Sequence, residues 1–169
     1  TEEITGQDLV EWQLRVASGE KLPLKQEELK INGWAMEARL YAEDPSTGFL
    51  PSIGLLREFR LPKTARVDSA LASGDEVSPF YDPMIAKIIA KGATRDAALA
   101  ALRDACAEIE VWPVKTNAGF LVRCLEQDAF REGDVQTGFI DARADVLRTT
   151  PEPGEYIVAQ IAYDFVSRR

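Results

Sequence analysis

Three charged residues whose spacing could form a binding site, Glu37, Arg39 and Glu43, lie in the stretch from Gly33 to Pro45. Residues in this stretch alternate between an apolar set and a second set that contains Glu37, Arg39 and Glu43. Such alternation is typical of a half-buried strand, where every second side chain lies on the same face. Glu37, and Glu43 further along, would then hold Arg39 while its planar guanidinium stays available to an anion. The competing interpretation is a solvent-exposed row of charges, which is common and contributes little to stability.

The other set of this stretch is apolar, and we expect it to face the hydrophobic core. It comprises Trp34, Met36, Ala38, Leu40 and Ala42. A strand with one apolar face needs other elements to cover that face, and the rest of the chain supplies them.

Further short strands and a few helices are predicted along the chain. Strands are predicted over 53–61, 66–69, 75–78, 84–91 and 110–114, separated by turn-forming residues. Helices are predicted from Leu9 to an end at Ser18-Gly19, after the capping residues Thr94 and Thr116, from about Thr137, and over 155–169. Short strands separated by turns favour antiparallel pairing. We therefore predict an α+β fold, with a small, mostly antiparallel β-sheet or open barrel and flanking helices.

The composition is that of an ordinary folded domain with an acidic surface. The 169 residues are 46% hydrophobic, which is enough to bury one good core. A net charge of −8 disfavours nucleic acid and anionic membrane surfaces as partners, because their negative charge repels an acidic protein at long range. The sequence contains neither an apolar run of roughly 18 residues nor a signal-peptide pattern.

Histidine and cysteine usage excludes several kinds of catalytic site. The chain has no histidine, so a histidine-dependent triad or a histidine-based metal centre within it is excluded. Its two cysteines, Cys106 and Cys124, lack the C-x-x-C spacing of a zinc site or redox pair. Each falls on an apolar helical stripe, and we interpret both as reduced core residues in a reducing compartment.

Four blocks of the sequence occur in the order found in a known family. They read TEEITGQDLVEWQLRVASGEKLPL, GWAMEARLYAEDPSTGFLPSIGLL, SGDEVSPFYDPMIAKII and VKTNAGFLVRCL. In these blocks, over about residues 1–140, the chain resembles the C-terminal part of biotin carboxylase. That enzyme is the ATP-dependent component, often the alpha subunit, of acetyl-, propionyl- and methylcrotonyl-CoA carboxylases. The last block contains Lys115-Thr116-Asn117, which matches the K-T-N of the family.

The resemblance implies the first half-reaction of biotin-dependent carboxylation, in which ATP and bicarbonate serve to carboxylate a carrier-bound biotin. In the family an arginine of the E-x-R strand stabilises charge on the ureido oxygen of biotin, a catalytic role that falls here on Arg39, with Glu37 in support. Arg66 matches an arginine at the dimer interface of free-standing bacterial enzymes. Trp34 follows Gly33 where the family often has histidine, and we expect it to be a packing variant on the inward set.

The resemblance also implies what this chain lacks. The family's ATP site, its magnesium or manganese ions and its catalytic glutamate lie upstream, so we expect a fragment without cofactor-binding or metal-binding residues and without activity on its own. The expected partners are the biotin carboxyl carrier domain, the carboxyltransferase subunit and the rest of the biotin carboxylase, with no nucleic acid and no membrane. The setting would be fatty acid metabolism, in the cytoplasm of a bacterium or the mitochondrial matrix of a eukaryote.

Three parts are expected along the chain. Residues 1–30 would be the end of an ATP-grasp core with a linker, 31–141 the biotin carboxylase C-terminal domain, and 142–169 a linker and helix leading to the next module. The alternative function is a non-catalytic closure or interaction domain of another ATP-grasp ligase. The Glu-x-Arg strand and the block YDPMIAK favour biotin carboxylase.

Overall fold

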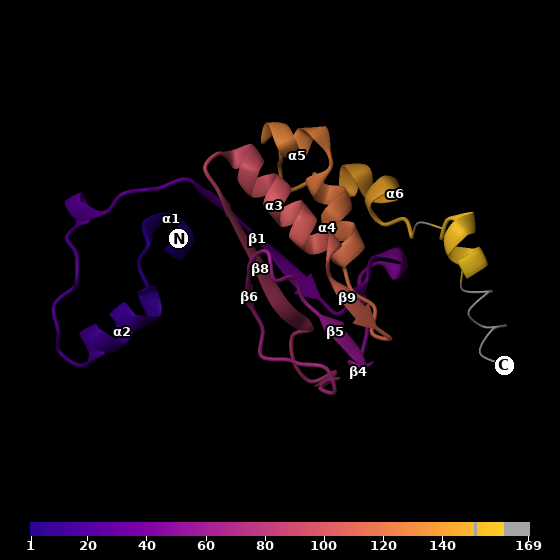
Figure 1. Cartoon of the computed structure of the whole chain (residues 1–169), viewed down its shortest axis with the longest axis horizontal. Coiled ribbons are helices and arrows are strands. Elements are labelled where there is room, and N and C mark those ends of the chain that lie inside the picture. The colour runs from indigo at the N-terminus through magenta and orange to yellow at the C-terminus, as the bar shows by residue number, and fades with distance from the viewer. Residues whose placement is uncertain (151, 161–169) are drawn as a thin grey trace.

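A three-stranded antiparallel sheet forms the centre of the molecule (Figure 1). The structure is a computed structural model that describes residues 1–150 and 152–160. In the sheet, β8 (Met84–Gly92) lies between β1 (Trp34–Tyr41) and β6 (Arg66–Asp68). This central place explains why the sequence of β8 is apolar on both of its alternating sets, because a strand with two neighbours and a covered face has little contact with water.

Helix α3 (Arg95–Ala107) covers one face of this sheet. Its predicted cap is confirmed, because Thr94 Oγ1 accepts a hydrogen bond from the amide of Ala97 at 3.2 Å. The strand before it runs directly into the helix at Gly92, where an added Cβ would lie 2.4 Å from the amide nitrogen of Ala98. Only glycine allows so close an approach of strand and helix. The core between sheet and helix includes Leu40, Leu56, Ile88, Leu102 and Cys106.

Shorter strands surround the central sheet in separate antiparallel pairs. These pairs are β2 (Glu43–Asp44) with β3 (Leu50–Pro51), β4 (Gly54–Leu55) with β7 (Glu76–Val77), and β5 (Glu58–Arg60) with β9 (Glu110–Trp112). Among the described residues, the sheets do not close into a barrel. The prediction of an α+β fold with small antiparallel sheets is therefore confirmed.

The prediction of one continuous strand over 53–61 is wrong, because the structure has two short strands there, β4 and β5. The chain breaks at Leu56, which has no exposed surface and turns into the core between β4 and β5. Its amide donates to the carbonyl of Asp75 and its carbonyl accepts from the amide of Gly74. Burial of this one side chain bends the backbone, so the two halves of the predicted strand pair with different partners.

A second layer of short helices lies beside α3 and contacts it mainly through α4. It consists of α4 (Ala118–Leu125), α5 (Asp128–Glu132), a 3₁₀ turn (Asp141–Arg143) and α6 (Ala144–Leu147). These helices enclose a second core cluster of Phe120, Cys124, Phe139 and Leu147. The helix predicted from about Thr137 begins at Ala144 instead, and α5 was not predicted. Of the helix predicted over 155–169, residues 155–160 are helical and exposed, and 161–169 lie outside the described residues.

Both cysteines are buried, as predicted. Cys106 lies on α3 and Cys124 on α4, with 1% and 8% of their surfaces exposed. Burial in an apolar environment raises the pKa of each thiol to about 11, because it disfavours the charged thiolate.

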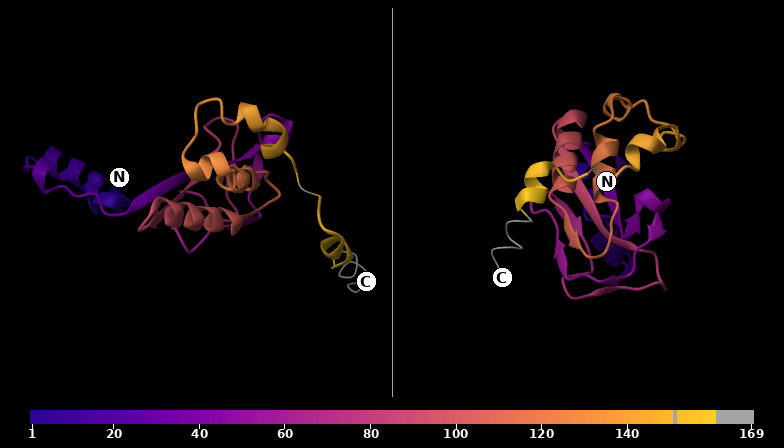
Figure 2. Two further views of the ribbon diagram at one scale, coloured as in Figure 1. Left: turned by 90° about the horizontal axis from the view of Figure 1, so that it is seen from above. Right: turned by 90° about the vertical axis from the view of Figure 1, so that its right-hand side faces the viewer.

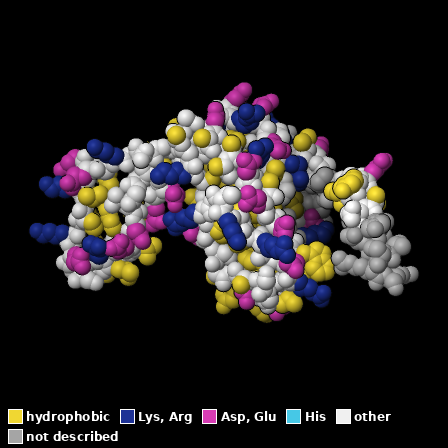
Figure 3. All heavy atoms as spheres, viewed as in Figure 1, with side chains coloured by type: hydrophobic (Ala, Val, Ile, Leu, Met, Phe, Trp, Pro, Cys, Tyr) yellow, Lys and Arg dark blue, Asp and Glu magenta, His cyan; other side chains and the backbone are white. Residues whose placement is uncertain are grey.

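The N-terminal arm extends away from the main body (Figure 2). It contains α1 (Glu2–Thr5) and α2 (Leu9–Ala17), and the carboxylate of Asp8 caps α2 by accepting from the amides of Val10 and Glu11. No residue of α2 is buried, and Val10 and Leu14 are 61% and 66% exposed. Figure 3 shows the resulting hydrophobic surface on this arm. None of the helices in the described part of the chain is both long and apolar enough to cross a membrane.

Candidate functional site

Arg39 and Glu37 lie side by side on the face of β1 that α3 does not cover. The Nε atom of Arg39 lies 3.3 Å from Oε1 of Glu37, and the two side chains are 60% and 41% exposed. Glu37, and then Tyr41, raise the pKa of Arg39 above its ordinary value by hydrogen bonding to the charged form. The guanidinium is therefore held by one carboxylate and still presents donors to the solvent.

Glu43 does not join this pair, contrary to the sequence-based expectation. The strand that carries Arg39 ends at Tyr41, after a register shift between Leu40 and Tyr41, and Glu43 belongs to β2. Burial, and then the negative charge of Asp82, raise the pKa of Glu43. The alternation of faces is interrupted at the end of β1, so residues 37 and 43 no longer share a surface.

Trp34 does not lie in the core. The alternation of the sequence had predicted that it would, because Trp34 belongs to the apolar set. Its side chain is 53% exposed. The cross-strand partner of Trp34 is Gly92, which has no side chain, and α3 begins only at Arg95. The core face of β1 therefore starts after its first residue.

A cavity of about 440 Å³ opens beside Arg39. Its wall is mostly apolar, with Met36, Ala38, Leu102, Phe120 and Phe139 among the lining residues. The charged and polar groups in the wall are Glu37, Arg39, Tyr41, Arg95 and Asn117. Electrostatic interactions are stronger beside an apolar wall than in open water, so this wall would strengthen the attraction between a bound anion and Arg39, which is itself 60% exposed.

Arg66 lies on the same sheet face, in a row with Glu37. In the antiparallel register, Ile89 of β8 pairs with Glu37 on one side and with Arg66 on the other. Residues paired in this way point to the same face of a sheet, so the topology brings the two candidate arginines onto one surface. The sequence alone did not place them together.

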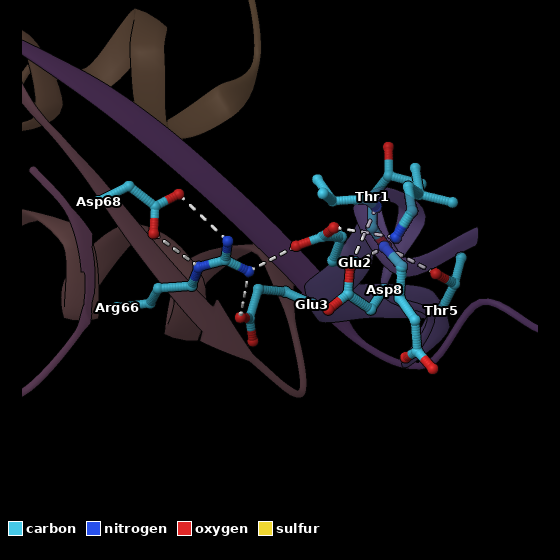
Figure 4. Close-up of polar contacts among 10 residues, drawn as sticks. Thr1, Glu2, Glu3, Thr5, Asp8, Arg66 and Asp68 are labelled. Carbon is cyan, nitrogen blue, oxygen red and sulfur yellow. Dashed lines mark hydrogen bonds and ion pairs between the residues drawn. The ribbon is translucent and has the colours of Figure 1, made fainter. Parts of the chain in front are cut away.

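Three carboxylates of the same chain hold the side chain of Arg66 (Figure 4). Its Nη1 atom lies 2.7 Å from Oε2 of Glu2 and 3.7 Å from Oε1 of Glu3, and its Nε atom lies 3.0 Å from Oδ1 of Asp68. The hydrogen bonds that Arg66 donates to Asp68 and Glu2 raise its pKa. These contacts fix α1 to the edge strand β6.

The contact between Glu2 and Arg66 predicts a pH dependence. The hydrogen bond from Arg66, and then the amide of Leu9, lower the pKa of Glu2 below its usual value of 4.5. The pKa is lower in the docked state, so the contact is fully stabilising above pH 4.5 and is lost as the pH falls through the lowered value. Carbon-13 NMR titration should give Glu2 a midpoint below 4.5, and the substitution Arg66→Gln should raise that midpoint. Equal midpoints in both proteins would contradict this prediction.

Within the described residues, no group of three or more carboxylates, cysteines or histidines is arranged to hold a metal ion. Magnesium in proteins is bound through carboxylates, and the carboxylates near Arg39 and Arg66 are engaged by arginines. The residues that the structure describes therefore supply no cluster suited to a metal ion.

Comparisons with known proteins agree with this fold and its charged strand. A sequence model of the family "Biotin carboxylase C-terminal domain" matches residues 37–142, a range that includes Arg39 and Arg66. "Biotin carboxylase 2" of Bacillus subtilis (strain 168) is 49% identical over 142 residues, which are 83% of this chain and 32% of that protein. The mitochondrial methylcrotonoyl-CoA carboxylase subunit alpha of Oryza sativa subsp. japonica is 47% identical over 156 residues, 90% of this chain and 21% of that protein.

Solved structures show the same architecture. The biotin carboxylase domain dimer of 2-oxoglutarate carboxylase from Hydrogenobacter thermophilus, in complex with MgADP, ADP and bicarbonate, superposes with a TM-score of 0.86 at 36% identity. The biotin carboxylase subunit of a pyruvate carboxylase gives a TM-score of 0.85 at 38% identity. Each superposition covers 89% of this chain and 34% of the solved chain.

The fold and the charged strand thus define a domain of the biotin-dependent carboxylases. The chain belongs to the biotin carboxylase C-terminal domain family, as its sequence blocks predicted. It spans about a fifth to a third of the length of the curated relatives described above.

Proposed function

We propose that this chain is the C-terminal part of a biotin carboxylase, which uses ATP and bicarbonate to carboxylate a carrier-bound biotin. The observation that carries the proposal is the Arg39–Glu37 pair on the uncovered face of β1, inside the residues matched to the family. The relative in complex with MgADP and bicarbonate supports the choice of substrates. The product would pass to a carboxyltransferase, which selects the acyl-CoA.

Arg39 would act on the charge that develops when biotin becomes a nucleophile. The ureido nitrogen of biotin is a poor nucleophile, and its deprotonation leaves negative charge on the ureido oxygen. A guanidinium already fixed by Glu37 stabilises that oxygen without reorganising during the reaction. The apolar cavity wall beside Arg39 would strengthen this interaction by limiting the access of water.

The remaining components of the reaction would come from outside this chain. ATP and its magnesium or manganese ions would bind in an upstream ATP-grasp core, to which residues 1–30 would belong, and residues 142–169 would lead to the next module. The partners would be a biotin carboxyl carrier domain and a carboxyltransferase subunit. The curated relatives include mitochondrial subunits and a bacterial enzyme, which supports a mitochondrial or a bacterial setting. Within it, the chain would act in the mitochondrial matrix or the bacterial cytoplasm, in fatty acid metabolism.

A role of Arg66 at a dimer interface stays a prediction. Its side chain is 41% exposed even with Glu2, Glu3 and Asp68 bound, so a second copy could still reach it. The related 2-oxoglutarate carboxylase domain is a dimer, which supports this assignment.

A segment exchange tests the proposed function. In Bacillus subtilis biotin carboxylase 2, the 142-residue segment that matches this chain would be replaced by the corresponding residues of this chain. The exchanged enzyme should cleave ATP in a biotin- and bicarbonate-dependent manner, whereas the isolated 169-residue chain should cleave none with magnesium or manganese. A folded exchange product without activity would favour the non-catalytic interpretation. ATP cleavage by the isolated chain would contradict the placement of the ATP site upstream.

A further inference from the structure

Asn117 is the one buried polar residue in the described part of the chain, with 6% of its surface exposed. It precedes α4, at the position where an asparagine side chain commonly caps a helix. Here the side chain makes no capping hydrogen bond. A buried amide needs partners, and Asn117 finds them on β1 instead of on its own helix.

Asn117 makes three hydrogen bonds to the backbone around Arg39. Its Oδ1 accepts from the amide of Tyr41 at 2.9 Å, and its Nδ2 donates to the carbonyl of Arg39 at 3.2 Å. Its own amide donates to the carbonyl of Tyr41 at 3.1 Å. One residue thus supplies the contacts that a neighbouring strand would otherwise make.

The position of these bonds on β1 matters because β1 is an edge strand. Its ladder with β8 uses one edge, and the register of that ladder shifts between Leu40 and Tyr41. The carbonyl of Arg39 and both backbone groups of Tyr41 are bonded by Asn117, a residue 76 positions away from Tyr41. Asn117 therefore holds the backbone where the regular ladder ends.

We propose that Asn117 is a positioning residue for Arg39, an inference that rests on the proposed function of Arg39. It fixes the backbone of residues 39 and 41 from the free edge of β1 and so directs the guanidinium. Asn117 also lines the cavity beside Arg39, on the side opposite the ladder with β8. Loss of the side chain would leave the carbonyl of Arg39 and the amide of Tyr41 without their partner and let this end of the strand shift.

A double-mutant cycle in the full-length enzyme tests the proposal. Asn117→Ala should lower kcat for biotin-dependent ATP cleavage about 10- to 100-fold, because small displacements of a catalytic group have effects of this size. The KM for ATP should stay within about twofold, since ATP would bind elsewhere. In an Arg39→Lys background the same substitution should change kcat by less than about threefold, because the group that it positions is already impaired.

Controls separate positioning from a loss of stability. Ser69→Ala removes another side chain that bonds the backbone of the same sheet, through the carbonyl of Ile85 at 2.8 Å, and should lower Tm while leaving kcat unchanged. Asn117→Ser keeps a hydroxyl that can bond one of the two backbone groups and places no charge at this buried position, so a folded protein with a smaller kcat loss is expected. This variant keeps the test decisive if Asn117→Ala does not fold.

The outcomes distinguish this proposal from the proposed function. Multiplicative effects of Asn117→Ala and Arg39→Lys on kcat, or normal kcat in a folded Asn117 variant, would overturn the positioning role alone. Normal kcat in Arg39→Lys would instead overturn the role of Arg39 itself. Strong effects of both single substitutions that do not multiply would support both proposals.

Discussion

Replacing Arg39 with lysine in the full-length enzyme is expected to lower kcat about a hundredfold or more. The change corresponds to roughly 3–4 kcal/mol of transition-state stabilisation, the amount typical for loss of one preorganised donor to a developing oxyanion. Lysine keeps the charge but loses the planar fork, which lets one arginine contact Glu37 and an anion together. The KM for ATP should change little, because ATP would bind outside this chain.

Arg60→Lys is the matched control for this experiment. Arg60 is an exposed strand arginine that pairs with Glu58, two residues before it, just as Arg39 pairs with Glu37. The same substitution there alters only surface ion pairs, with Glu58 and with Glu110 of β9, and such pairs contribute about 0–1 kcal/mol. Turnover and Tm of Arg60→Lys should stay near those of the unmodified enzyme. A stable Arg39→Lys enzyme with near-normal turnover would remove Arg39 from the site.

Truncation of Ile88 to alanine is expected to destabilise the isolated chain by about 2–5 kcal/mol. Ile88 has no exposed surface, lies on the central strand β8 and pairs with Ala38 and Val67 of the two flanking strands. Its removal would leave a cavity between the sheet and α3 that the surrounding strands cannot close. This cost is a large share of the stability of a small domain.

Urea denaturation of the 169-residue chain measures this effect, with Ile31→Ala as the control. Ile31 is 78% exposed, so the same truncation there removes surface and creates no cavity. Its effect should stay within about 0.5 kcal/mol. The two variants should share the same m-value, because both unfold the same core. A loss below about 1 kcal/mol for Ile88→Ala would show that this core is loosely packed.

Local patterns in the sequence were sufficient for the elements whose surroundings are regular. The apolar run of β8 and the cap at Thr94 predicted a buried strand followed by a helix, and both are confirmed. The alternation around Arg39 placed Ala38 and Leu40 in the core correctly. In these elements, whether a side chain is buried follows mainly from the periodicity of the surrounding sequence.

Sequence periodicity failed to predict burial and strand pairing at positions where these depend on a segment far away in the sequence. Trp34 is exposed because Gly92, far along the chain, pairs with it, and Leu56 breaks a predicted strand because the core accepts its side chain. Arg66 shares a face with Glu37 only through the strand order, which periodicity does not reveal. The K-T-N match drew attention to Asn117. Its hydrogen bonds to β1 could not be predicted from local sequence, because Asn117 and Tyr41 are 76 positions apart.

The reaction rates of the two buried thiols would report how often the helices that carry them open. A thiol reagent reacts with the thiolate, and with pKa values of about 11 and little exposed surface, Cys106 and Cys124 should react slowly while the helices are packed. Opening of α3 or α4 would restore an ordinary pKa and access to the reagent, so the labelling rate measures how often each helix opens. With no other cysteine in the sequence, the reagent marks these two helices and no other part of the chain.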